Sequence, residues 1–316
     1  MKPDTAPLFV GCATALVTPM LPAPAGDGYT PPPVDYEAFV RLVRRQIAAG
    51  VDALVVCGTT GESPTLTDEE KLRLFSLAVQ ESRRAEAEGI ARRHIPVIAG
   101  TGSNNTARAV TLSRLAEKAG CDGLLAVTPY YNKANQAGLV AHYAAITAAV
   151  PLPLLAYHVP GRTGCRLTPE TCLTLSRMEQ IVGLKDATGD AAFTARVAAL
   201  CGNALPLYAG CDDCILPVLA LGGRGAVSVA SNLYPDTVTA LCRAYHSGDT
   251  AQARRLQADL LPLCEALFAD VNPIPVKAAL AGLGLCRDVL RLPLTPAGED
   301  VRRRVRDATQ KAGRPV

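Results

Sequence analysis

Short, continuous apolar runs alternate with longer amphipathic stretches through about the first 245 residues of the chain. Continuous apolar runs of this length are typical of strands that are buried on both faces, as in a parallel sheet. The pattern predicts eight strands, at 9–18, 52–57, 95–100, 123–129, 153–159, 181–187, 205–210 and 225–230.

Amphipathic segments with helical periodicity separate and follow these runs. Several begin with capping chemistry: Thr67 can cap a helix, and Glu70 can reach back to it three residues later. The pattern predicts eight helices here, at 35–49, 67–89, 104–119, 136–149, 168–177, 190–201, 212–221 and 234–247.

Eight consecutive strand–helix units predict an α/β protein built as a closed (β/α)8 TIM barrel. A doubly wound open sheet shows the same alternation over part of its length, but the count favours the barrel. Such barrels commonly take about 250 residues as one unit.

The pattern becomes wholly helical after residue 248, with segments at 249–269, 273–285 and 297–312. We therefore predict a catalytic barrel over 1–248 and a small C-terminal helical domain over 249–316.

Composition and charge narrow the class of protein. Hydrophobic residues make up 49% of the 316 residues and charged residues 19%, which suits a large buried core. The formal net charge of +3 gives no field strong enough to recruit nucleic acid, and the basic run 302–306 is interpreted as a solvated helix face. No nucleic-acid partner is expected.

Eleven cysteines, an odd number, are scattered along the chain, which favours reduced thiols packed as small core residues. Cys211 and Cys214 form a C-x-x-C pair, but no second pair or spaced histidine completes a zinc site, so neither a metal nor a cofactor is expected. The N-terminus lacks a signal-peptide pattern and no window is long and apolar enough to span a membrane, so we expect a soluble, cytoplasmic protein.

Polar residues that end apolar runs are the first candidates for chemistry, because active sites of α/β barrels lie at the carboxyl ends of the strands. Lys185 is the only lysine within a predicted barrel strand. Desolvation there lowers the pKa of an amine and makes it a nucleophile that can form a Schiff base with a carbonyl substrate. A structural lysine paired with Asp186 is the alternative.

Two further strand-end residues have plausible roles. Tyr157 could relay protons, although a packed ring with a hydrogen-bonded hydroxyl is the commoner use of a tyrosine there. Arg162 could bind a substrate carboxylate in two-point contact, or be an ordinary surface arginine. The GTTGES segment (58–63) could hold a carboxylate through backbone N–H groups, but it is not a Walker loop, and GTGSNN (100–105) lacks a dinucleotide fingerprint.

Taken in order, the strings GTTGES, GTGSNNT, TPYYN, YHVPGRTG, GLKDATGD, AGCDD, GAVSVASN and NPIPVK resemble the dihydrodipicolinate synthase family from about residue 9 to residue 312. The wider group of pyruvate lyases includes N-acetylneuraminate lyase. The resemblance implies class I condensation of pyruvate with L-aspartate 4-semialdehyde to 4-hydroxy-tetrahydrodipicolinate, in lysine and diaminopimelate biosynthesis.

The resemblance also implies a role for each matching residue. Lys185 would form the Schiff base, and Tyr157 would exchange protons in a relay with Thr59 and Tyr131. The substrate-binding residues would be Thr60, Gly210 and Val227 around pyruvate and Arg162 on the carboxylate of the second substrate.

Assembly and regulation follow from the same resemblance. Tyr131 is similar to a residue that reaches into a neighbouring subunit, so we expect at least a dimer and favour a homotetramer, a dimer of dimers. Ser63, Asn104 and Tyr130 resemble a lysine-effector pocket. In that pocket an alanine, two histidines and a glutamate are replaced by Pro64, Asp68, Lys71 and Arg108. Since Lys71 and Arg108 would repel a lysine ammonium, we expect weak or absent feedback by lysine.

Two other functions remain open from the sequence. The nearest is another pyruvate aldolase of the same family, acting on N-acetylneuraminate, keto-deoxy-gluconate or hydroxy-oxoglutarate. The other is a non-catalytic barrel that binds a small molecule. His158, where asparagine is commoner beside the tyrosine, has no role that the sequence defines.

Overall fold

The computed structural model describes residues 6–24 and 28–312. The two ends of the predicted domains, 1–5 and 313–316, and residues 25–27 lie outside the described residues.

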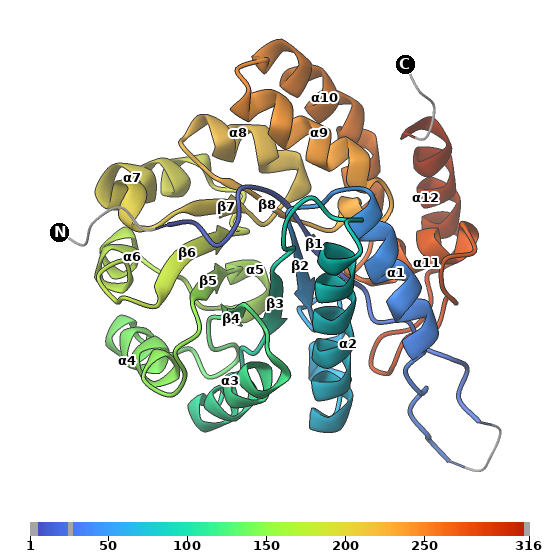
Figure 1. Ribbon diagram of the computed structural model, residues 1–316, viewed down its shortest axis with the longest axis horizontal. Coiled ribbons are helices and arrows are strands. Elements are labelled where there is room, and N and C mark those ends of the chain that lie inside the picture. Colours follow the sequence, from blue (N-terminus) through green and yellow to red (C-terminus); the bar gives the residue numbers. More distant parts are fainter. Residues whose placement is uncertain (1–5, 25–27, 313–316) are drawn as a thin grey trace.

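A closed barrel of eight parallel strands forms the centre of the molecule, with each strand paired to its neighbours in sequence and β1 paired to β8 (Figure 1). The TIM barrel is thereby confirmed and the open sheet excluded. The strands are β1 (Gly11–Ala15), β2 (Ala53–Val56), β3 (Val97–Gly100), β4 (Gly123–Val127), β5 (Leu154–His158), β6 (Ile181–Asp186), β7 (Leu207–Ala209) and β8 (Gly225–Ser228).

Helices surround the barrel, and every helix that the sequence predicted is present, with ends shifted by a few residues. They are α1 (Tyr36–Ala48), α2 (Asp68–Ala87), α3 (Thr106–Ala119), α4 (Gln136–Thr147), α5 (Pro160–Thr163), α6 (Pro169–Leu175), α7 (Ala191–Cys201), α8 (Ile215–Ala220), α9 (Pro235–His246), α10 (Thr250–Leu267), α11 (Ile274–Gly282) and α12 (Glu299–Ala312). The short α5 was not predicted, because a single turn leaves no periodicity to detect.

Local chemistry explains where helix α2 begins and how the barrel closes. Thr67 and Glu70 form the predicted capping box at the start of α2, with both reciprocal hydrogen bonds present. The barrel closes where β1 meets β8, and a Cβ on Gly225 would lie 1.8 Å from the Gly11 carbonyl oxygen. Only glycine fits at this approach of the two backbones.

Two large apolar clusters hold the fold together, with a third, small one in the C-terminal region. The inner cluster fills the barrel and includes Val55, Leu155, Tyr157 and Val227. The outer cluster lies between strands and helices and continues into α10–α12. The C-terminal helices therefore share a core with the barrel, and the division at residue 248 stays a proposal about organisation.

The remaining predictions from composition can be placed in this fold. All the cysteines are buried except Cys211, Cys214 and Cys286, which are partly exposed, and all are free thiols. The basic run is an exposed face of α12, where Arg302 and Arg303 pair with Asp288 and Asp300. No helix in the described parts of the chain is long and apolar enough to cross a membrane.

Candidate active site

Lys185 lies inside the barrel, on strand β6 beside Tyr157 of β5. The parallel register pairs the two residues directly, so their side chains share the inward face. Lys185 is only 5% exposed, and its Nζ lies 4.2 Å from the centre of the Tyr157 ring. The two sequence candidates for nucleophile and proton relay are thus brought into contact.

Burial changes the acid–base chemistry of this lysine. Desolvation lowers the pKa of Lys185 to about 8; nearby Cys211 and Asp212 oppose the shift, and Arg162 adds to it. Asp186 is not its partner, because that carboxylate accepts hydrogen bonds from the Thr194 hydroxyl at 2.6 Å and from the Thr188 N–H at 3.0 Å. The structural alternative from the sequence, a Lys185–Asp186 pair, is therefore wrong.

Tyr157 is held as a neutral phenol. Burial raises the pKa of Tyr157 to about 12, while Arg162 and a hydrogen bond with the Thr59 side chain lower it in part. A protonated phenol in contact with both an amine and a hydroxyl can donate a proton and then take one back. Thr59 and Tyr157, the two relay candidates of this chain's own barrel, are therefore joined by a hydrogen bond.

The GTTGES segment forms a tight turn after β2. The Gly58 carbonyl accepts hydrogen bonds from the N–H groups of Gly61 and Ser63, at 3.1 and 3.3 Å. Thr60 is buried in this turn, and its hydroxyl oxygen accepts a hydrogen bond from the Asn272 side chain. The turn holds Thr59 and Thr60 on a rigid backbone at the barrel mouth.

Arg162 lies on α5, the single turn that follows β5. Its Nη2 donates to the backbone oxygen of Asn272 at 3.2 Å, while the residue as a whole is exposed. The contact orients the guanidinium and leaves donors free for a ligand, because only this one hydrogen bond of the guanidinium is made to a described residue.

A cavity of about 320 Å³ lies at this end of the barrel, and its wall includes Thr59, Tyr157 and Arg162. Tyr157 is part of this wall. Lys185 is not, but it lies directly against the Tyr157 ring. Its volume falls within the range of about 300–1,000 Å³ that is typical of small-molecule sites.

Gly210 and Val227 lie at the carboxyl ends of β7 and β8. A Cβ on Gly210 would lie 2.7 Å from the Cβ of Ala187, so this position excludes side chains. Val227 belongs to the same inner cluster as Tyr157. The Gly210 N–H donates to the Asp186 oxygen at 2.7 Å, next to Lys185 in the chain, and neither Gly210 nor Val227 is part of the cavity wall.

Tyr131 is not brought to the other site residues within one chain. Its side chain is 88% exposed, its φ of 73° is in the left-handed region, and its N–H donates to the Thr163 oxygen at 3.3 Å. The neighbouring Tyr130 lines the cavity instead.

Two basic residues, Lys71 and Arg108, line the cavity wall. Lys71 is 4% exposed and lines the wall together with Arg108, and burial lowers the pKa of Lys71. Arg108 forms a two-point ion pair with Asp68.

His158 points away from the barrel interior, as expected for the residue after an inward-facing Tyr157. Its Nε2 accepts a hydrogen bond from the Leu167 N–H at 3.1 Å, its ring packs on Phe193, and burial lowers its pKa to about 4. A neutral imidazole in this position supports the outer face of β5 and does not touch the cavity.

Four residues around the site were missed by sequence reasoning: Glu62, Lys277, Asn272 and Arg291. The first three lie inside strings that were noticed, GTTGES and NPIPVK, but nothing in a linear string indicates that these two segments meet. They do so here through buried hydrogen bonds.

Comparison with known proteins agrees with the family resemblance of the sequence. The model of the dihydrodipicolinate synthetase family matches residues 8–312. A 4-hydroxy-tetrahydrodipicolinate synthase from Geobacter sulfurreducens is 44% identical over 292 residues, which cover 92% of this chain and 94% of the relative.

Solved structures are similar over the same length. Dihydrodipicolinate synthase from Cyanidioschyzon merolae, solved with lysine bound, has a TM-score of 0.88 and 39% identity over 98% of this chain and 99% of the other. A monomeric dihydrodipicolinate synthase variant has the same TM-score and identity over 97% of each chain.

Proposed function

The chain belongs to the dihydrodipicolinate synthetase family, and from this premise we propose that it condenses pyruvate with L-aspartate 4-semialdehyde to form 4-hydroxy-tetrahydrodipicolinate. The observation that carries the proposal is the buried Lys185 amine, with its pKa lowered to about 8, in contact with the Tyr157 ring. The reaction belongs to lysine and diaminopimelate synthesis, and we place it in the cytoplasm.

The first half of the reaction uses Lys185 and Tyr157. The neutral Lys185 amine attacks the ketone carbon of pyruvate, and loss of water gives an imine. The imine withdraws electrons from the methyl group, which loses a proton to give an enamine. Tyr157, hydrogen-bonded to Thr59, is placed to move these protons.

The second half joins the two substrates. The enamine carbon attacks the aldehyde of L-aspartate 4-semialdehyde, whose carboxylate the Arg162 guanidinium binds. The amine of that substrate then attacks the imine carbon, the ring closes, and Lys185 leaves as a free amine. Thr60, Gly210 and Val227 hold the pyruvate carboxylate and its surroundings, and fixing both small partners in one cavity lowers the entropic part of the barrier.

We propose that the active unit is a homotetramer, a dimer of dimers, in which Tyr131 completes the proton relay of a neighbouring subunit. The 88% exposure of Tyr131 supports this, because a relay residue cannot act from bulk water. Light scattering on the purified protein tests it. A fully active monomer would contradict it, and the monomeric relative makes that outcome a real alternative.

We also propose that lysine inhibits this protein weakly or not at all. The positive charge of Lys71 in the cavity wall supports this, since it repels the ammonium group of lysine.

Borohydride reduction in the presence of pyruvate, followed by intact-mass and peptide mass measurement, tests the proposed chemistry. We expect one pyruvate-derived adduct, located on Lys185. Absence of an adduct would support a non-catalytic binding barrel. An adduct followed by turnover with a sugar aldehyde in place of the semialdehyde would favour another aldolase of the family.

A further inference from the structure

Asn272 connects two of the proposed substrate-binding residues. Its side-chain Nδ2 donates to the Thr60 hydroxyl oxygen at 3.0 Å, and its backbone oxygen accepts from the Arg162 Nη2 at 3.2 Å. The three residues come from the loop after β2, from α5 and from the connection between α10 and α11. One buried residue of the C-terminal helical region therefore touches the groups assigned to both substrates.

The direction of the first hydrogen bond sets the chemistry of Thr60. Because the Asn272 amide occupies a lone pair on the Thr60 oxygen, the Thr60 O–H proton must point elsewhere. A hydroxyl arranged in this way is a donor toward the site, which suits a pyruvate carboxylate. The Asn272 Oδ1 is buried and has no hydrogen-bond partner within residues 6–24 and 28–312, so the amide nitrogen alone makes the contact.

A buried ion pair holds the two segments together. Lys277 is 0% exposed and donates to the Glu62 carboxylate at 2.6 Å and to the Thr18 oxygen at 3.0 Å. Glu62 follows Thr60 by two residues, and Lys277 follows Asn272 by five. The Lys277–Glu62 ion pair therefore joins the same two segments as the Thr60–Asn272 hydrogen bond and holds that contact in place.

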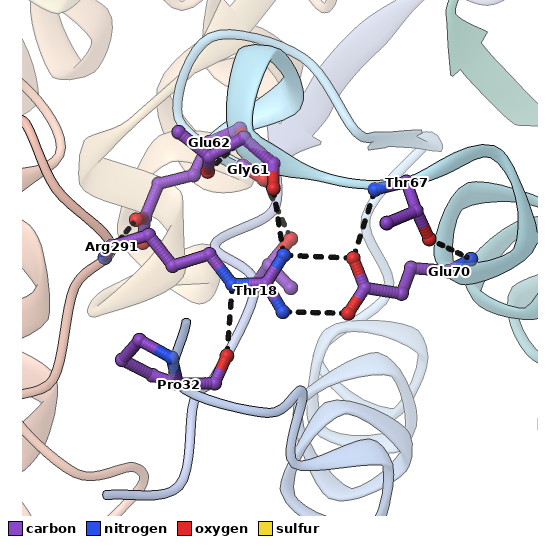
Figure 2. A network of polar contacts seen from close by, with 8 residues as sticks. Thr18, Pro32, Gly61, Glu62, Thr67, Glu70 and Arg291 are labelled. Carbon is purple, nitrogen blue, oxygen red and sulfur yellow. Dashed lines mark hydrogen bonds and ion pairs between the residues drawn. The ribbon is translucent and has the colours of Figure 1, made fainter. Parts of the chain in front are cut away.

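Arg291 extends this anchor away from the site, as Figure 2 shows. Its backbone N–H donates to Glu62 Oε2 at 3.0 Å. Its guanidinium binds both carboxylate oxygens of Glu70, and its Nε donates to the Pro32 backbone oxygen. In the same view the Thr18 hydroxyl donates to the Gly61 oxygen at 2.7 Å. The turn that carries Thr60 is therefore tied down on several sides.

We propose that Asn272 is a positioning residue that orients the Thr60 hydroxyl as a hydrogen-bond donor to the pyruvate carboxylate. This inference rests on the proposed function, in which Thr60 binds that carboxylate. Because the contact with Arg162 uses the Asn272 backbone, a change of the Asn272 side chain acts on pyruvate and leaves the second substrate nearly unaffected.

The isosteric variant Asn272→Asp tests the direction of the hydrogen bond. The aspartate cannot donate, so the Thr60 O–H turns toward it, and its negative charge lies beside the pyruvate carboxylate. We expect the pyruvate KM, and the pyruvate concentration that half-saturates the borohydride adduct, to rise tenfold or more. The kcat and the KM for the semialdehyde should change less than threefold.

Asn135→Asp is the matched control, since Asn135 is an exposed N-cap whose acceptor oxygen an aspartate retains. It should leave both KM values unchanged. An unaltered pyruvate dependence in Asn272→Asp would overturn the proposal. An equal rise in the KM for both substrates, together with a lower Tm, would also overturn it, because that would indicate a merely structural role.

Asn272→Ala and Thr60→Val provide a second route if the aspartate variant does not fold. Each should raise the pyruvate KM, and the double variant should be little worse than Thr60→Val alone, because Asn272 acts through Thr60. Additive effects would overturn the proposal. Absence of an adduct in the unmodified protein would instead remove the proposed function itself, so the two failures are distinguishable.

Discussion

Lys185 and Lys277 are both buried, yet their surroundings give them opposite uses. Lys277, on α11, is 0% exposed and forms an ion pair with Glu62 at 2.6 Å. Lys185, on β6, is 5% exposed, and no carboxylate of the described chain pairs with it. The Lys277–Glu62 pair holds two segments together, whereas burial lowers the pKa of Lys185 to about 8 and makes its amine available as a nucleophile.

The largest expected effect comes from removing the unpaired amine. Lys185→Met should lower kcat by at least about 1000-fold, because no other group can form the imine. Stability should stay the same or rise, since methionine fills a similar volume without a buried charge to desolvate. Steady-state rates and thermal unfolding measure the two quantities. Retained activity, or a loss explained by unfolding, would contradict the assignment.

The contrast between the two lysines also shows what the sequence could predict. Lys185 was found because it interrupts an apolar strand and because barrel topology places strand ends in one mouth. Lys277 looked ordinary in NPIPVK, since its partner Glu62 is more than two hundred residues away in the chain. The eight strands follow from apolar runs alone, but contacts between loops and C-terminal helices depend on tertiary packing that no local pattern encodes.

The role of Tyr131 depends on assembly and not on the fold of one chain. The resemblance implies a relay role for it in a neighbouring subunit, and within one chain Tyr131 is 88% exposed and does not line the cavity. A contribution from a neighbouring subunit has no signature in local sequence, because the pattern of a single chain reports only burial within that chain. The relay therefore remains a proposal that depends on assembly.

The second prediction concerns the loss of the Lys277–Glu62 ion pair. Glu62→Gln leaves the Lys277 ammonium buried and unpaired, which should lower the free energy of unfolding by about 3–5 kcal/mol. Arg303→Ala is the control, because it removes the exposed Arg303–Asp300 pair and should cost about 0–1 kcal/mol. Denaturant unfolding of both variants checks this. Equal, small losses would mean that Lys277 is not held as a paired charge.

The third prediction concerns pH and Lys185. With its pKa lowered to about 8, the neutral fraction of the amine rises about tenfold per pH unit below that value. Imine formation, followed by borohydride trapping, should therefore speed up from pH 6 to pH 8 and then level off. Tyr157, with its pKa raised to about 12, and His158, with its pKa lowered to about 4, do not change protonation in this range.

The sign of the stability effect follows from the same shift. Between pH 8 and 10.5 the unfolded chain keeps a proton on Lys185 that the folded protein has released, so the contribution of this group to stability rises with pH in that window. Below pH 8 its desolvation cost is fully present. Comparing unmodified protein with Lys185→Met across the window isolates the contribution; parallel curves would contradict the lowered pKa.

The smallest expected effect concerns a third buried lysine, Lys71, which has neither a carboxylate partner like Lys277 nor a place beside the phenol like Lys185. Its charge in the cavity wall repels a cation, while Asp68 already pairs with Arg108 and is not free to attract one. Added lysine at millimolar concentration should therefore change the steady-state rate by less than about twofold, since like charges offset the contacts that the cavity offers.

A double variant sharpens this last comparison. Lys71→His with Arg108→Glu replaces one cation by a group that is mostly neutral at pH 8 and the other by an acid that can pair with an ammonium. Inhibition by lysine should then increase several-fold, measured against the rate of the same variant without lysine. Strong inhibition of the unmodified protein would show instead that a buried lysine without a carboxylate does not keep cations out of this cavity.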